Sequence, residues 1–227
     1  MAARWSAIQR SLIMHPVDGS ISDFVMADWG SNAGYFSIKL AQFFAGSTVL
    51  AVEGEAYQEY NKARKMHEKR AREAGVWGKT LSCNTKISGE EFRAIAKRGQ
   101  FDVQLTLSVF HWLSISDHEH FLEMLGWNLA AARTTFLELP EARVYGENTG
   151  QSFANKLNSW YGGNVSEETL VKMACDKVLH SRCKVRNLGI MFHDTGTVRT
   201  ILRVDVAESD GAKRLTEEFL KKELKCK

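Results

Sequence analysis

Short apolar runs alternate with helix-like segments through the first 140 residues, and this alternation restricts the fold more than any other feature of the chain. The apolar runs have the length of buried strands, and the segments between them fit helices. Strands that alternate with helices predict a parallel, doubly wound α/β sheet. We expect strands at residues 23–28, 48–53, 79–84, 101–109 and 134–139, and helices at residues 5–14, 35–44, 56–74, 89–97 and 117–132.

The C-terminal part follows a different pattern. Residues 184–192 and 198–206 are two β-rich runs joined by only five residues, which predicts an antiparallel hairpin. A final charged helix is expected at residues 212–225. The expected fold is therefore a seven-stranded, mostly parallel α/β sheet with a C-terminal hairpin. The chain has two prolines and no low-complexity linker, so we interpret residues 1–227 as one domain.

Composition and charge exclude several classes of protein. The net charge is only +3, and the basic residues of the helix expected at residues 56–74 are interleaved with Glu68 and Glu73. This pattern indicates a solvated face rather than a nucleic-acid surface. No stretch reaches the roughly 18 uninterrupted apolar residues of a membrane span. Residues 1–10 also lack the apolar core of a secretory signal.

The cysteines bear on the compartment. They form no C-x-x-C pair, so a zinc knuckle is not expected, and their scatter favours reduced thiols over a disulfide framework. We therefore expect a cytoplasmic protein without membrane attachment. The four residues are Cys83, Cys175, Cys183 and Cys226.

A glycine-bearing loop, DWGSNAGYFS from Asp28 to Ser37, follows the first expected strand. Gly30 permits a close approach of backbone to ligand, and Gly34 lets the next helix pack near the strand. The two glycines are four residues apart, whereas the G-x-G-x-x-G loop of dinucleotide-binding proteins needs a pair two apart. The second strand ends at Glu53, where an acidic residue can accept hydrogen bonds from ribose hydroxyls.

This loop and acid together resemble the cofactor motifs of class I, Rossmann-like methyltransferases that use S-adenosylmethionine (SAM). The loop matches the family pattern D-x-G-x-x-x-G-x-x-S, and the C-terminal hairpin is typical of the same family. The resemblance implies that the loop wraps the methionine end of SAM. Asp28 would contact the ammonium, directly or through water, and Glu53 the ribose. Either Cys83 or Asn84 would lie near the adenine, although the family's G-D-x pattern is missing there.

A second stretch, LSVFHW at residues 107–112, resembles the family run L-S-x-x-H-W that follows the fourth strand. It implies that Ser108 to Phe110 pass beside SAM, with His111 and Trp112 at the reaction face. The full set of cofactor-binding residues implied in this way is Asp28, Gly30, Ser31, Asn32, Gly34, Tyr35, Phe36, Glu53, Gly54, Asn84, Ser108, Val109 and Phe110.

A hydroxyl acceptor needs a base or a metal to remove its proton. Candidates after the fourth and fifth strands are His111, Asp117, His118, His120, Glu138 and Glu141. We take His111 as the expected base and Glu138 as the second catalytic candidate, with a packing role for His111 as the alternative. His111, Glu138 and Glu141 are also candidate ligands of Mg²⁺ or Mn²⁺. The spacing of the two glutamates loosely resembles the E-x-x-H metal site of small-RNA 2′-O-methyltransferases, with Glu141 in place of the histidine. The pair His118 and His120 does not share one helical face and is also interpreted as a solvated helix start.

Residues 145–170 are rich in Asn, Ser, Gly and aromatic residues and are expected to form an acceptor-side lid. Trp112, Glu141, Trp160 and Tyr161 are the candidate substrate-binding residues, because aromatic and polar groups together can stack on and hydrogen-bond a sugar or base. The alternative is that the aromatic residues of this segment complete the core.

Three functions fit these features. The chain resembles stand-alone sugar or glycan O-methyltransferases of bacteria and large DNA viruses, which implies methyl transfer to a hydroxyl of a sugar, glycan or other small polar metabolite. The N/D-P-P-Y/F motif of amine methyltransferases is absent. An RNA-end methyltransferase is the second hypothesis, with nucleic acid as the less favoured partner. A SAM-binding subunit without activity of its own is the third. The sequence does not determine the oligomeric state.

Overall fold

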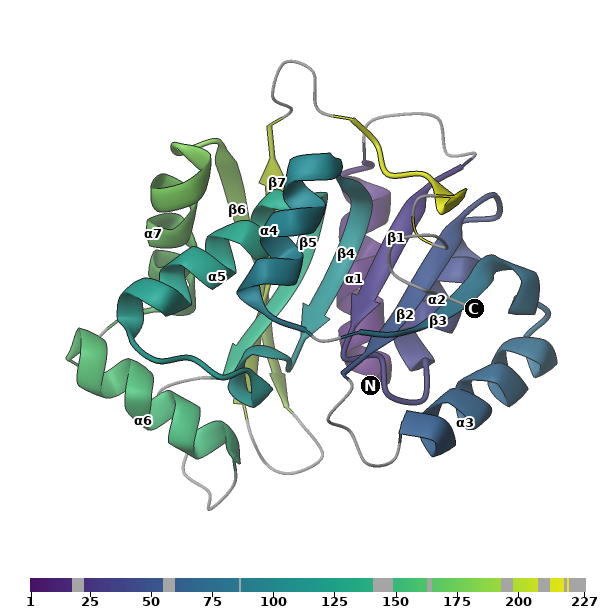
Figure 1. The fold of residues 1–227 in the computed structure, drawn as a ribbon, viewed down its shortest axis with the longest axis horizontal. Coiled ribbons are helices and arrows are strands. Elements are labelled where there is room, and N and C mark those ends of the chain that lie inside the picture. Colours follow the sequence, from purple (N-terminus) through teal and green to yellow (C-terminus); the bar gives the residue numbers. More distant parts are fainter. Residues whose placement is uncertain are drawn as a thin grey trace.

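The computed structural model describes residues 1–17, 23–54, 60–85, 87–140, 149–162, 165–192, 198–207, 213–218 and 220. These residues form a seven-stranded sheet in the order β3-β2-β1-β4-β5-β7-β6. Neighbours among the first five strands are parallel, and β7 pairs antiparallel with both β5 and β6 (Figure 1). The strands are β1 (Val25–Trp29), β2 (Thr48–Glu53), β3 (Thr80–Asn84), β4 (Phe101–Leu107), β5 (Ala132–Pro140), β6 (Cys183–Phe192) and β7 (Val198–Val206).

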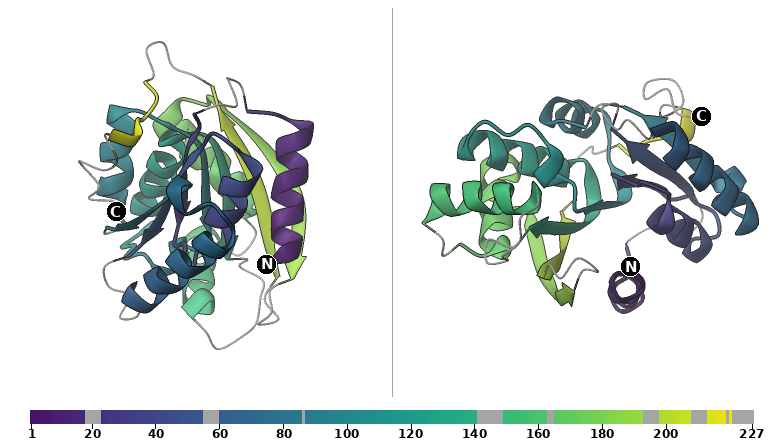
Figure 2. Two further views of the ribbon diagram at one scale, coloured as in Figure 1. Left: turned by 90° about the vertical axis from the view of Figure 1, so that its right-hand side faces the viewer. Right: turned by 90° about the horizontal axis from the view of Figure 1, so that it is seen from below.

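Helices cover both faces of the sheet, as the alternating pattern requires (Figure 2). They are α1 (Ala2–Met14), α2 (Tyr35–Phe43), α3 (Tyr60–Glu73), α4 (Gly89–Arg98), α5 (His118–Ala130), α6 (Thr149–Tyr161) and α7 (Glu167–Leu179), with two 3-10 turns, η1 (Trp77–Lys79) and η2 (Phe110–Trp112). Every residue of β1 is buried, because successive side chains enter opposite cores. One core contains side chains of α1, α2 and α3, and the other those of α4 to α7.

The first helix packs beside the hairpin at one side of the sheet (Figure 2). Its carboxyl end is held by Arg203 of β7, whose Nη1 donates hydrogen bonds to the carbonyl oxygens of Ser11 (2.8 Å) and His15 (2.6 Å). Carbonyls in the last turn of a helix have no partner within the helix, so a cation there is favourable. This anchor places the first turn of α1 near the carboxyl end of β5, where Arg4 meets Glu138.

The expected α/β sheet with its C-terminal hairpin is confirmed. The structure extends the first helix to Ala2 and adds α6 and α7, which the sequence did not predict as helices. Helix α7 is capped at its amino end by Ser166, whose hydroxyl accepts a hydrogen bond from the amide of Thr169, and acidic residues occupy its first turn. A serine followed by acidic residues is a helix-start signal that could have been recognised in the sequence. The hairpin loop at residues 193–197 and half of the helix expected at 212–225 lie outside the described residues; of the described half, residues 213–216 are not helical, and 217, 218 and 220 are.

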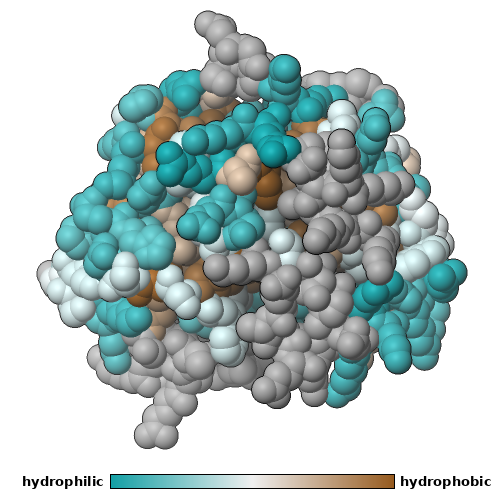
Figure 3. Space-filling model, viewed as in Figure 1, coloured by the Kyte–Doolittle hydropathy of each residue, from teal (hydrophilic) through white to brown (hydrophobic). Residues whose placement is uncertain are grey.

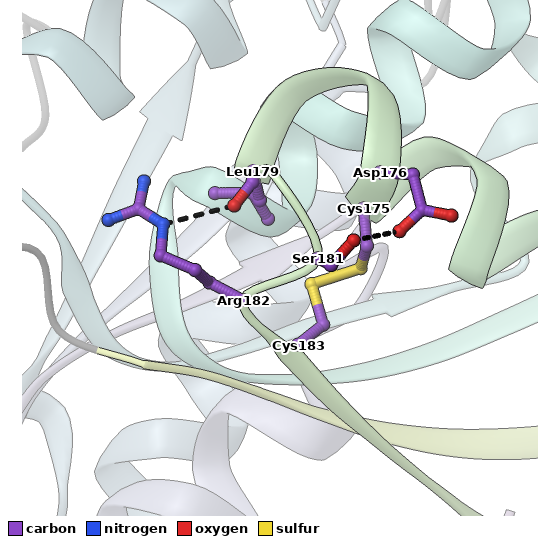
Figure 4. Close-up of a disulfide and its surroundings, with 6 residues drawn as sticks. All are labelled: Cys175, Asp176, Leu179, Ser181, Arg182 and Cys183. Atoms are coloured by element: carbon purple, nitrogen blue, oxygen red, sulfur yellow. Dashed lines mark hydrogen bonds between the residues drawn. A yellow bond between two sulfur atoms is a disulfide. The ribbon is translucent and has the colours of Figure 1, made fainter.

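A disulfide joins the end of α7 to the start of β6, between Cys175 and Cys183 (Figure 4). The turn inside this loop is also fixed by a hydrogen bond from Arg182 Nε to the carbonyl of Leu179 (3.0 Å) and by one from Ser181 to Asp176. None of the described cysteines is a free thiol, so the expectation of reduced thiols is wrong. Scattered cysteines do not reveal pairing when the fold brings an α-helix and a strand together.

Where the face shown in Figure 3 is coloured, it is mainly hydrophilic, and apolar residues are visible between polar ones. This is the outer side of helices that turn their apolar stripe towards the sheet. Among the described residues, no helix has the length and apolar composition to cross a membrane.

Candidate functional site

The carboxyl ends of the five parallel strands, β1 to β5, lie at one edge of the sheet, the lower edge in Figure 1. Register places Trp29 of β1 beside Val52 of β2, and Leu107 of β4 beside Glu138 of β5. The loops that follow these strands therefore lie next to one another. In doubly wound sheets this edge is where ligands bind.

The loop between β1 and α2 is bound tightly to the end of β2. The amides of Gly30 and Ser31 both donate hydrogen bonds to the carbonyl of Val52, at 2.9 and 3.0 Å. The amide of Asn32 donates to Oε2 of Glu53 at 2.7 Å. The glycine loop and Glu53 are separated in sequence by helix α2 and strand β2. In the structure they contact each other directly and form one contiguous site.

The two glycines of this loop have left-handed backbones, with φ of 69° at Gly30 and 74° at Gly34. A Cβ at Gly30 would lie 3.0 Å from Cγ2 of Val109, and one at Gly34 only 2.1 Å from the ring of His67. A Cβ at Gly54, by contrast, would meet no atom within 4 Å. Positions 30 and 34 therefore require glycine, because a side chain would clash there. Open space lies beside Gly54, at the end of β2. Both features fit a ligand that lies against the chain here.

Asp28, at the end of β1, has a role that the sequence analysis did not foresee. Its Oδ2 accepts hydrogen bonds from the amide (2.9 Å) and the hydroxyl (2.6 Å) of Ser37, in the first turn of α2. Burial raises the pKa of this carboxyl to about 7, against the opposing effect of the two bonds from Ser37. Asp28 therefore closes the loop on the helix. Its contact with the SAM ammonium stays a prediction.

Glu53 is half-buried and accepts hydrogen bonds from the amides of Asn32 (2.7 Å) and Gly54 (3.1 Å). Burial raises the pKa of its carboxyl, while these two bonds lower it. The carboxylate lies where the sequence predicted a ribose-binding acid, at the end of β2 and against the glycine loop. A carboxylate next to the open space at Gly54 fits the ribose hydroxyls that SAM would present here.

The remaining expected cofactor residues divide between the edge and the core. The backbone of Asn84 ends β3 and pairs in register with Glu53, and Cys83 is fully buried, so which of the two lies near the adenine stays open. Tyr35 and Phe36 begin α2 and pack edge to face on each other. Phe110 is fully buried and packs against Phe121, so its side chain belongs to the core.

The chain makes a sharp turn after β4. Ser108 has φ of 61°, an uncommon value for a residue other than glycine. Val109 is buried beneath Gly30, and η2 then carries His111 and Trp112 outwards. The His111 ring lies 5.0 Å from that of Trp112, and Trp112 is 69% exposed. A partly buried imidazole beside an exposed indole thus follows directly on the cofactor edge.

Glu138 is held by neighbours that the sequence analysis missed. Its side chain is fully buried and accepts a hydrogen bond from Ser108, and Arg4 Nε lies 3.3 Å from its Oε1. Nη1 of Arg199 lies 3.8 Å from its Oε2. No local pattern could reveal this cluster, because residues from α1, β5 and β7 meet only in the folded chain.

The metal hypothesis gains no support from these contacts. Glu141 lies outside the described residues. Within the part of the chain that the structure describes, no three His, Cys, Asp or Glu residues are grouped to hold a metal ion. His118 and His120 lie at the start of α5, where His118 pairs with Glu119 and His120 with Ser116, in keeping with a solvated helix start. Asp117 caps the same helix by accepting from the amide of His120 (2.9 Å).

The expected lid contains α6 and the first residues of α7, whereas residues 141–148 and 163–164 are not described. Helix α6 contacts η2 and β5, and its role as an acceptor-side lid stays a prediction. Phe153 is buried against Phe121, and Trp160 and Tyr161 are half-buried against the same core. These aromatic residues complete the core, as in the alternative interpretation, and Trp112 is the aromatic candidate that remains exposed.

No protein-family model and no curated protein matches the chain. Solved structures do resemble it. A candidate O-methyltransferase from Nostoc punctiforme aligns with 90% of this chain at 13% identity and a TM-score of 0.54, and the chain spans 56% of that protein. The methyltransferase domain of bacterial CtHen1 aligns over 90% of this chain and 97% of its own, at 10% identity and a TM-score of 0.54. An O-methyltransferase family protein from Burkholderia thailandensis aligns over 89% of this chain and 57% of its own, at 9% identity and a TM-score of 0.51. The chain has the Rossmann-like methyltransferase fold.

Proposed function

We propose that this protein is a SAM-dependent methyltransferase that transfers a methyl group to a hydroxyl oxygen of a sugar, glycan or other small polar metabolite. The observation that carries the proposal is the loop at Gly30 to Gly34 bound to Glu53 at the carboxyl edge of the sheet. The fold of known methyltransferases supports it.

The cofactor side is assigned to residues of this edge. Glu53 would accept hydrogen bonds from the ribose hydroxyls, and the loop at Gly30 to Asn32 would lie against the methionine end. When bound, SAM supplies an electrophilic methyl group on its sulfonium. Because Val109 packs under Gly30, the turn after β4 fixes the distance between the cofactor loop and the acceptor side.

The acceptor side needs a base and a surface for the substrate. A neutral imidazole can remove a hydroxyl proton near neutral pH, and His111 lies directly after the cofactor strand. In this assignment the acceptor oxygen gives its proton to His111 as it accepts the methyl group. The exposed Trp112 ring beside it presents an apolar face on which a sugar ring can stack.

The test is transfer of labelled methyl from SAM to a panel of sugars, glycans and RNAs, with and without Mg²⁺. We expect His111→Ala to lower the rate roughly 10²- to 10⁴-fold, the usual contribution of a general base, without weakening SAM binding. His118→Ala is the matched control, because His118 is exposed at the start of α5, and it should leave the rate unchanged. Transfer only to RNA would replace the sugar by a nucleic-acid acceptor. Equal rates for His111→Ala and the wild type would remove His111 as the base.

A further inference from the structure

A buried cluster of three charges lies where β5 ends, and its charges do not balance. Among the described residues, Glu138 is its single carboxylate, and Arg4 and Arg199 are its two guanidinium groups. Their residues are 0%, 7% and 8% exposed, respectively. Burial lowers the pKa of Arg199, the charge of Glu138 raises it, and the charge of Arg4 lowers it. Counted over the residues that the structure describes, the cluster therefore carries one excess positive charge in a buried place.

The hydrogen bonds of the cluster are also incomplete. Nη1 of Arg199 and Oε1 of Glu138 are buried without hydrogen-bond partners among the described residues. Arg199 Nη1 lies 3.8 Å from Glu138, beyond hydrogen-bond distance. A buried guanidinium that lacks an acceptor is unfavourable, and an arginine stays charged under physiological conditions. One arginine would be enough to pair with Glu138, so an ion pair that only stabilises the fold does not require Arg199.

The position of the cluster connects it with the acceptor side. Ser108 donates to Glu138 and is itself partly exposed at the end of β4, so the cluster reaches the surface next to the turn that carries His111. Arg199 pairs in register with Pro140, the last residue of β5. Arg4 lies in the first turn of α1, where no acidic residue is present to offset its charge.

We propose that Arg4 and Arg199 form an anion subsite that binds a carboxylate or phosphate group of the methyl acceptor. Guanidinium groups bind both anions through paired, charge-assisted hydrogen bonds. Glu138 holds the two arginines in place and sets the net charge at +1, which suits one anionic group. This inference rests on the proposed function for the identity of the ligand as acceptor, and it narrows the substrate class from neutral sugars to acidic ones, such as sugar phosphates or uronic acids.

The first experiment measures anion binding alone. The thermal unfolding midpoint of the wild type is followed in inorganic phosphate, in acetate and in chloride at constant ionic strength. We expect phosphate or acetate to raise the midpoint relative to chloride, and the stronger of the two identifies the ligand group. In Arg199→Met this shift should vanish, while the variant remains folded because Arg4 and Glu138 still form a balanced pair. Arg64→Met, which removes a partly exposed arginine of α3, should keep the full shift.

The second experiment measures methyl transfer to glucose, glucose 6-phosphate and glucuronic acid. We expect kcat/KM for one of the two acidic sugars to exceed that for glucose at least tenfold, and Arg199→Met to abolish the preference. Calorimetric SAM binding, measured on the same samples, separates the two hypotheses: SAM binding without any anion effect contradicts the subsite alone, and an anion effect without SAM binding contradicts the proposed function. The subsite is also contradicted if Arg199→Met shows the same anion shift as the wild type.

Discussion

The edge proposed to bind the cofactor and the edge proposed to bind the acceptor, called the cofactor edge and the acceptor edge below, are neighbours in space but are built in different ways. The cofactor edge comes from one stretch of chain between Asp28 and Gly54, in which loop, helix and second strand contact one another directly. The acceptor edge combines Arg4, Ser108, Glu138 and Arg199 from four distant segments. A contiguous site is visible in sequence as a motif, whereas an assembled site exists only after folding. The first edge is also held mainly by backbone hydrogen bonds, and the second by buried charges.

This contrast predicts that the acceptor edge is the more vulnerable to loss of one charge. Glu138→Gln leaves two buried guanidinium groups without a carboxylate, so we expect the free energy of unfolding to fall by about 4 kcal/mol. Urea denaturation measures the change. Glu68→Gln is the control, because its ion pair with Arg64 on α3 is partly exposed, and it should cost less than about 1 kcal/mol. A similar small loss for both variants would mean that the cluster contributes little to folding.

The cofactor edge should instead be sensitive to a single added carbon. Gly34→Ala places a Cβ 2.1 Å from the His67 ring and forces a left-handed backbone on alanine, so we expect a loss of about 3 kcal/mol. Gly78→Ala, where a Cβ would meet no atom within 4 Å, should be nearly neutral. Urea denaturation of both variants gives the comparison. The tight packing described here is contradicted if the two substitutions cost the same.

The stability of the cofactor edge should also depend on pH, because Asp28 titrates there. Asp28 has a folded pKa of about 7, raised from 3.8 by burial. A raised pKa means that the folded state binds the proton more tightly than the unfolded state, so this group stabilises the fold at low pH and that stability is lost as the pH rises from about 4 to 7. Asp28→Asn keeps an acceptor for Ser37 but cannot titrate.

We therefore expect the wild type to lose at least about 1 kcal/mol more than Asp28→Asn between pH 5 and pH 7.5, as measured by urea denaturation at each pH. Other groups titrate in the same range, but they do so in both proteins and cancel in the difference. Parallel pH profiles for the two proteins would show that Asp28 titrates normally.

The sequence predicted the fold well because its evidence is local. Each strand, each helix, the glycine loop and the acid at the end of β2 can be recognised from a short stretch of consecutive residues. The parallel arrangement of the strands then brings the glycine loop and Glu53 to one edge of the sheet. The role of Asp28 was harder to predict, since its bond to Ser37 depends on how α2 meets β1. Trp160 and Tyr161 have the composition of a binding surface, but their burial against the α5 side became visible only with the packing of α6. The ion cluster at Glu138 and the Cys175–Cys183 disulfide had no sequence signal at all.

The most direct test of the account is a calorimetric titration of the purified protein with SAM. We expect saturable binding with a dissociation constant on the order of micromolar, and at least a tenfold loss, about 1.4 kcal/mol, in Glu53→Ala. Glu73→Ala, which removes an exposed carboxylate of α3, should bind as the wild type does. Absence of SAM binding in the wild type, or equal affinity in Glu53→Ala, would contradict the assignment of this edge as the cofactor site.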